Sequence, residues 1–177
     1  MHPPIMRTAL NIGALYGLST FAFFLLLYYG GFHPLGASSM FGAWLPIIFV
    51  IIGIRFYRDK ECGGTIGYWL AFRAGFLTIV CGGALAALLL YLFGIVGAPD
   101  LVNSYKEEML QGMEQTESMM RGMFGDKFFD LNVENINKTT LSSIATTDFF
   151  NKCLGGAIVS LIAAAFLKRK PTADQIV

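Results

Sequence analysis

Charged residues are missing from two long stretches of this 177-residue chain. Residues 8–54 and residues 74–99 contain no lysine, arginine, aspartate or glutamate. Runs that long and apolar cannot be the core of a soluble domain, whereas a hydrocarbon layer of about 30 Å needs roughly 20 apolar helical residues to be crossed. We therefore predict an all-α integral membrane protein, with four transmembrane helices and an extracytoplasmic helical segment between the third and the fourth.

Catalytic and metal-binding patterns are missing as well. Cys62, Cys81 and Cys153 form no Cys-x-x-Cys pair, so neither a disulfide framework nor a zinc site is predicted. His2 and His33 are expected near opposite membrane faces, and no nucleophile–base pair can be assembled. Ionisable residues mark proton and ion routes inside membranes, and none is expected deep in a span. We expect no enzymatic activity, no cofactor and no nucleic-acid partner.

The apolar runs define a single membrane domain over residues 1–177. Its four predicted spans are residues 9–30, 37–54, 69–97 and 149–167. Pro46 is expected to kink the second span, because proline removes a helical hydrogen bond. The connecting parts are a cytoplasmic loop at 55–68, an extracytoplasmic segment at 98–148 and a cytoplasmic tail at 168–177.

The distribution of charge predicts the orientation of these spans. Residues 98–152 carry five basic and nine acidic residues, whereas basic residues dominate the other flanks. Lysine and arginine in short loops remain on the cytoplasmic side, so both termini are expected in the cytoplasm of a bacterial inner membrane. The residues that determine this topology are Arg55, Arg58, Lys60, Arg73, Lys168, Arg169 and Lys170.

The outer segment contains one clear periodic pattern. Apolar residues recur at helical spacing from Leu101 onward, which predicts an amphipathic helix over residues 101–124 with Asp100 as its N-cap. Gly125 and Asp126 end this helix. Residues 127–138 are expected to be irregular, and residues 139–150 to form a short helix that leads into the fourth span.

Methionine is unusually frequent on this amphipathic helix. Thioether sulfur is a soft ligand for Cu(I), so Met109, Met113, Met120 and Met123 are candidate copper ligands. Alternatively, methionine supplies an adaptable apolar face that rests on the membrane or on a partner helix. We favour the apolar face, because no cysteine or histidine accompanies the cluster and methionine is a good helix former.

Small residues are spaced for close helix packing in two of the predicted spans. Gly13 and Gly17 are four apart in the first span, and Gly156 and Ser160 are four apart in the fourth. Packing within one chain is preferred over dimerisation, because four spans must already pack together. The expected partners are the lipid bilayer and, through such faces, a second copy or other membrane proteins.

Two stretches around the second and third spans carry a resemblance to a known family. They are Gly-Ile-Arg-Phe-Tyr-Arg at 53–58 and Gly-Thr-Ile-Gly-Tyr-Trp-Leu-Ala-Phe-Arg-Ala-Gly at 64–75, followed by Lys168 at the end of the fourth span. The layout resembles the bacterial membrane family called domain of unknown function 4199, found chiefly in Bacteroidota. Gly67 and Tyr68 replace the family's more usual Thr-Phe. The resemblance implies a bacterial inner membrane and no assigned activity.

These observations predict a non-enzymatic structural or accessory membrane protein of unknown function. Its outer amphipathic helix would contact the membrane surface or a partner. The alternative is a component of a transporter or channel formed by oligomerisation, and copper handling through methionine is a further alternative.

Overall fold

Helices make up the regular structure in the described part of the chain. The computed structural model describes residues 5–32, 34–35 and 42–169. Within these ranges it contains six helices: α1 (Ile5–Tyr29), α2 (Leu45–Glu61), α3 (Tyr68–Val96), α4 (Leu101–Phe124), α5 (Asp126–Asn137) and α6 (Leu141–Leu167). The predicted all-α class is confirmed.

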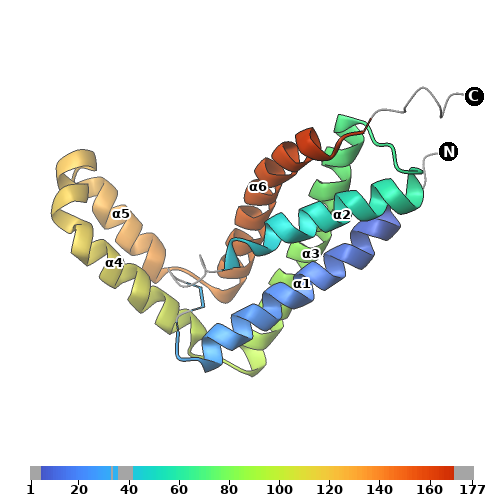
Figure 1. The fold of residues 1–177 in the computed structure, drawn as a ribbon. Coiled ribbons are helices and arrows are strands. Elements are labelled where there is room, and N and C mark those ends of the chain that lie inside the picture. The colour runs from blue at the N-terminus through green and yellow to red at the C-terminus, as the bar shows by residue number, and fades with distance from the viewer. Residues whose placement is uncertain (1–4, 33, 36–41, 170–177) are drawn as a thin grey trace, which may run out of the picture.

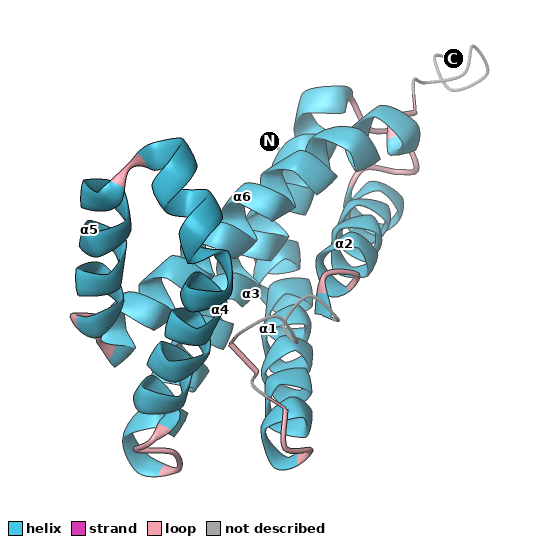
Figure 2. Cartoon of the chain, turned by 90° about the vertical axis from the view of Figure 1, so that its left-hand side faces the viewer, coloured by secondary structure: helices cyan, strands magenta, loops and turns pink. Residues whose placement is uncertain are grey.

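The helices form two regions that diverge from each other. Helices α1, α2, α3 and α6 form a bundle in which α3 packs against the other three. Helices α4 and α5 form a hairpin that leaves one end of the bundle sideways, so that the two regions make a V in Figure 1. Figure 2 shows α4 and α5 side by side, in front of the bundle.

Three bundle helices are long and apolar enough to cross a membrane, which indicates a membrane protein. They are α1, α3 and α6, with 25, 29 and 27 residues. Each includes most of one predicted span. Helix α2 has 17 residues and is not among the three candidates in the described part of the chain.

The second predicted span differs most from the structure. Residues 37–41 lie outside the described residues, and α2 begins only at Leu45. Pro46 therefore lies in the first turn of α2, and the predicted kink within the span is wrong. The first turn tolerates proline because its N–H groups have no partner within the helix. The helix then continues through Arg55 to Glu61, so residues expected in the cytoplasmic loop are helical.

The backbones of α1 and α3 are in direct contact, because glycines occupy the positions where the two helices meet. A Cβ atom added at Gly13 would lie 2.8 Å from the carbonyl oxygen of Thr78. One added at Gly17 would lie 2.6 Å from the carbonyl oxygen of Gly82. Neither position has room for a side chain, which is how small residues bring membrane helices together.

Helix α6 packs on the other side of α3 through small residues too. A Cβ atom at Gly156 would lie 2.5 Å from Cγ2 of Ile79. Ser160 is fully buried, and its Oγ would lie 3.0 Å from a Cβ at Gly75. The four predicted packing residues, Gly13, Gly17, Gly156 and Ser160, thus lie at contacts within the bundle.

The start of α1, the end of α6 and the α2–α3 loop lie at the same end of the bundle (Figure 1). Ile66 in that loop pairs with Arg169 just beyond α6. The Ile66 amide donates to the Arg169 carbonyl at 3.0 Å, and the Arg169 amide donates back at 2.9 Å. Ile66 is buried in the same apolar cluster as Tyr57 of α2 and Ala164 of α6.

An aromatic cluster closes the opposite end of the bundle and holds the base of the hairpin. Phe93 of α3 makes edge contacts with Phe24 and Tyr28 of α1, with ring centroids 5.8 Å and 5.2 Å apart. Leu101, the first residue of α4, is buried in the same cluster as Ile144 of α6. The hairpin is therefore fixed where it leaves the membrane bundle.

Candidate functional site

Helix α4 has the bounds that its apolar periodicity predicts, residues 101–124. Asp100 occupies the predicted N-cap position, but its side chain accepts no capping hydrogen bond. The Ser104 hydroxyl donates to the Asp100 carbonyl at 3.1 Å. Gly125, with φ of +83°, ends the helix in a backbone conformation that favours glycine.

The prediction of irregular structure over 127–138 is wrong, because α5 occupies Asp126–Asn137. Phe129 is buried, and Val133 and Ile136 are half-buried. These residues are spaced four and three apart, which places them on one helix face. The helix packs against α4, so its apolar face is covered by a partner that periodicity alone does not reveal.

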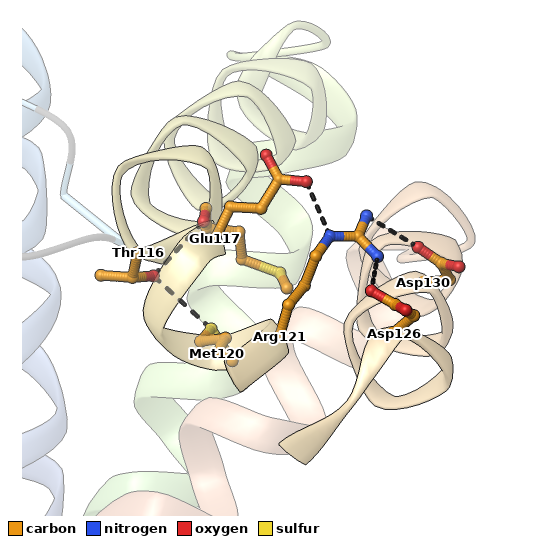
Figure 3. A network of polar contacts seen from close by, with 7 residues as sticks. Thr116, Glu117, Met120, Arg121, Asp126 and Asp130 are labelled. Atoms are coloured by element: carbon orange, nitrogen blue, oxygen red, sulfur yellow. Dashed lines mark hydrogen bonds and ion pairs between the residues drawn. The ribbon is translucent and has the colours of Figure 1, made fainter. Parts of the chain in front are cut away.

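Arg121 links the two hairpin helices (Figure 3). Its guanidinium donates to Glu117 of α4 at 2.8 Å, and to Asp126 and Asp130 of α5 at 2.9 Å and 3.1 Å. The same group lies 4.3 Å from the ring centroid of Phe129. Hydrogen bonds to Glu117 and Asp126 raise the pKa of Arg121 above its ordinary value, so this cation keeps its charge at every working pH.

A second polar contact joins the hairpin at its other end. The Lys106 ammonium of α4 donates to the carbonyl oxygen of Asn137, the last residue of α5, at 2.8 Å. Since lysine bonds an otherwise open C-terminal carbonyl here, the contact also favours the end of α5 electrostatically. The two contacts hold α4 and α5 together near both ends of the shorter helix.

Large apolar side chains are exposed on both hairpin helices, on either side of the turn at Gly125. Met123 of α4 is 69% exposed, and Leu131 of α5 is 57% exposed. The rings of Phe124 and Phe128 lie 5.0 Å apart across the turn. We call this set the tip patch: Met119, Met123, Phe124, Phe128 and Leu131.

The four candidate copper ligands differ in exposure. Met109, Met113 and Met120 are half-buried, whereas Met123 belongs to the exposed tip patch. The Thr116 hydroxyl lies 3.5 Å from the sulfur of Met120 (Figure 3). Among the described residues, no group of three or more histidine, cysteine or acidic side chains could hold a metal ion.

The basic residues that are predicted to determine the topology lie towards the end of the bundle where Ile66 pairs with Arg169. Arg58 lies in the last turn of α2, where its guanidinium donates to Asp59 at 2.7 Å. This hydrogen bond holds the pKa of the Asp59 carboxyl below its ordinary value. Arg55 and Lys60 also lie in α2, Arg73 in the second turn of α3, and Lys168 and Arg169 just after α6. Lys170 lies outside the described residues.

Helix α6 begins well before the fourth predicted span. The Thr140 side chain accepts from the Ser143 amide, and the Ser143 side chain accepts from the Thr140 amide, so a capping box starts the helix at Leu141. The short helix predicted over 139–150 thus forms the first turns of α6 and continues into the fourth predicted span without a break. Asp148, which the prediction placed just before the span, and Lys152, which it placed in the span's first turn, both lie inside this continuous helix.

Asp148 and Lys152 form an ion pair that the sequence analysis missed. Their side chains are only 26% and 20% exposed, in a helix long and apolar enough to cross a membrane. The available signal was their spacing, since an acid four residues before a lysine can pair along one helix face. Pairing lowers the cost of two charges that would each be expensive alone in an apolar setting.

The ion pair lines a cavity of about 320 Å³ on the bundle. Aromatic and aliphatic residues of α1, including Phe24 and Leu27, form one wall, and Leu45 of α2 contributes to another. Asp148, Asn151 and Lys152 of α6 supply polar groups to this mostly apolar space. A concave apolar site with a few convergent polar groups is the usual form of a small-molecule site.

The comparison with protein families gave one match. The family model described as Protein of unknown function (DUF4199) matches residues 11–169, which is most of the chain, and confirms the family that the sequence resembles. Comparisons with curated proteins and with solved structures gave no match. The matched residues include all four bundle helices except the start of α1, and the whole hairpin.

Proposed function

The chain belongs to this family of unknown function, and we propose that it is a non-enzymatic accessory protein of a bacterial inner membrane whose outer hairpin binds a partner protein. The observation that carries the proposal is the tip patch, whose five large apolar side chains are each exposed near the turn at Gly125. Exposed apolar patches mark interaction sites, and the contact between the Phe124 and Phe128 rings forms the centre of this one. Aromatic residues and methionine are also the types enriched at protein interfaces.

The proposed topology has four membrane crossings with both termini in the cytoplasm. Helices α1, α3 and α6 supply three crossings, and the segment that ends in α2 returns the chain between α1 and α3. The basic residues near the α2–α3 loop support the orientation, because lysine and arginine in short loops stay inside. The hairpin is then extracytoplasmic.

The charge of the hairpin favours a protein partner over the bilayer surface. Residues 101–137 contain seven acidic and three basic residues, a net charge of −4. Bacterial membrane surfaces carry anionic lipids, which attract basic segments and repel acidic ones. A partner surface with an apolar centre and basic borders would match both the tip patch and the acid-rich helices around it.

Photo-cross-linking in living cells tests this proposal. A photoreactive phenylalanine analogue at Met123 or Leu131 would report on the tip patch, and the same analogue at Gln115, an exposed polar position of α4, serves as the control. We expect one discrete protein adduct from both tip positions and none from Gln115. Adding Phe128→Glu to the Leu131 reporter should remove that adduct, because a charge would enter the apolar contact.

Two results would overturn the proposal. Tip positions that cross-link only to phospholipid would show that the bilayer covers the patch. An equal adduct at Gln115 would show that the contact does not involve the apolar surface. An adduct of twice the chain mass, confined to the tip positions, would identify the partner as a second copy and support the docking role.

A transporter or channel component remains the alternative prediction. Substitution of a small residue in α3 does not test it. Bulky substitution at Gly82 of α3 would be expected to block a path lined by small residues. However, a Cβ at Gly82 would clash with the backbone of Gly13, so loss of flux would report a damaged bundle. Solute flux by the reconstituted wild-type chain is the measurement that would favour this alternative.

A further inference from the structure

The cavity beside the Asp148–Lys152 pair has the properties of a lipid site within the bundle. Its volume of about 320 Å³ is at the small end of the range for small-molecule sites, roughly 300–1,000 Å³, so one hydrocarbon chain is a suitable occupant. Phe24 and Leu27 of α1 and Val159 of α6 contribute apolar lining. Since α1 and α6 are both candidate membrane-crossing helices, lipid is the most concentrated apolar ligand around this cavity.

The depth of the ion pair corresponds to the boundary between headgroups and hydrocarbon. Asp148 lies 19 residues before Leu167, the end of α6, which at 1.5 Å per residue is about 28 Å along the helix. The hydrocarbon layer is about 30 Å thick. If Leu167 lies at one boundary of that layer, Asp148 lies at the other, where the polar part of a lipid is found.

The polar groups of the cavity match a headgroup that carries both signs of charge. Asp148 has a second carboxylate oxygen beyond the one that accepts from Lys152, and the Lys152 ammonium has two further N–H donors. A purely anionic headgroup would approach Lys152 but would also face the Asp148 carboxylate. A headgroup with a phosphate and a primary ammonium satisfies both residues, and Asn151 adds a neutral donor and acceptor.

We propose that this cavity binds a zwitterionic aminophospholipid, with one acyl chain among the α1 and α2 side chains. The lipid's phosphate accepts from Lys152, and its primary ammonium donates to Asp148. This site shares no residue with the tip patch of the hairpin, so a negative result for one proposal does not affect the other.

Gly155 offers a direct way to fill the cavity without disturbing the helices. It lines the cavity, and a Cβ added there meets no atom within 4 Å. Gly155→Leu therefore places a side chain in open space and also removes a residue that disfavours helix. Ala165→Leu, at an exposed position of α6 that does not line the cavity, is the matched control.

Native mass spectrometry of the full chain in mild detergent measures the proposed binding. Phosphatidylethanolamine, phosphatidylglycerol and phosphatidylcholine with identical acyl chains would be added separately at equal concentration. We expect a one-to-one adduct with phosphatidylethanolamine, about tenfold more abundant than with the other two, since one charge-assisted hydrogen bond is worth about that factor. Gly155→Leu should remove the adduct and Ala165→Leu should retain it. Asp148→Asn should remove the preference for ethanolamine over choline.

Equal adducts for all three lipids, unchanged by Gly155→Leu, would overturn the proposal and indicate lipid bound around the bundle without selection. Retention of the selective adduct in Gly155→Leu would also overturn it, because the cavity would not be the site. Should Gly155→Leu fail to fold, the melting temperature of the wild type decides: phosphatidylethanolamine must raise it more than the other two lipids do.

Discussion

In the bundle, α1 and α3 touch through glycines that leave no room for a side chain, whereas in the hairpin one arginine joins α4 and α5 through extended charged groups. The glycine contact between α1 and α3 leaves no space for water, whereas the carboxylates that bind Arg121 are exposed. Adding an atom to a close-packed contact is destabilising. Exposed ion pairs contribute little individually and are screened by salt. The two regions should therefore respond to different perturbations.

Gly17→Leu should have the largest effect on stability. A Cβ there already lies 2.6 Å from the Gly82 carbonyl, so α1 and α3 must separate to admit the side chain. We expect a loss of about 3 kcal/mol, the upper part of the range for overpacked interiors. The melting temperature of the purified protein in detergent measures it.

Gly112→Ala in α4 is the matched control for that substitution. A Cβ at Gly112 meets no atom within 4 Å, and alanine favours helix over glycine by about 1 kcal/mol. We expect unchanged or increased stability. A loss at Gly112 as large as at Gly17 would contradict the distinction between the two regions.

Asp148→Ala should have the next largest effect, because it leaves Lys152 without its partner inside α6. Removing one member of a buried pair costs about 3–5 kcal/mol, and the residual exposure of these side chains lowers our expectation to about 2 kcal/mol. Asp126→Ala, which removes a 78% exposed carboxylate from the hairpin, should leave the melting temperature of the bundle unchanged. Equal shifts for the two variants would count against a partly buried ion pair that stabilises the bundle.

Arg121→Met should loosen the hairpin and leave the bundle intact. It removes the contacts to Glu117, Asp126 and Asp130 while keeping an unbranched apolar side chain near Phe129. We expect several-fold faster amide hydrogen exchange over α5, and no change over α1 and α3.

Two controls accompany that measurement. Lys127→Met removes an equal charge from α5, and Lys127 makes no ion pair within the part of the chain that the structure describes. It should leave exchange over α5 unchanged. Raising the salt concentration to about 1 M, where the screening length falls to about 3 Å, should reproduce part of the Arg121→Met effect in the wild type.

Replacing Met109, Met113, Met120 and Met123 together with leucine should have the smallest effect. Leucine and methionine have similar volumes, and such exchanges usually cost under about 1.5 kcal/mol each. We expect the hairpin to keep its exchange protection and its cross-linked partner. Cu(I) titration of the full chain should give the same result before and after the replacement. Sulfur-dependent binding in the wild type alone would make copper handling the leading function.

Hydropathy and helical periodicity predicted α1, α3 and α4 closely, because in these elements one signal dominates. The predicted bounds of the second span differ from those of α2 for a physical reason. An uncharged run shows which residues a lipid environment accepts, but it does not show where a helix begins or ends. Pro46 suits a first turn, and the charged residues after Ile54 continue the helix to Glu61. Only the packing of α2 on α3 distinguishes a helix over Leu45–Glu61 from the predicted span over 37–54.

Helix α5 and the Asp148–Lys152 pair were missed because each depends on a partner. The face of α5 formed by Phe129, Val133 and Ile136 is short, and it becomes meaningful only when α4 lies against it. The sequence prediction assigned Asp148 to the extracytoplasmic segment, so the fourth span was predicted to begin after it. Within a continuous α6, lysine four residues later compensates its charge. The cavity beside them is lined by residues of four helices, α1, α2, α3 and α6, so no local sequence pattern predicts it.

The pairing of Ile66 with Arg169 has a consequence for biosynthesis. The α2–α3 loop leaves the ribosome early, whereas Arg169 follows every helix of the structure. Chains are made from the N-terminus, so Ile66 has no backbone partner at Arg169 until α6 has been synthesised. The two hydrogen bonds between Ile66 and Arg169 therefore form after all six described helices have been synthesised, which makes this pairing a late step in the folding of the bundle.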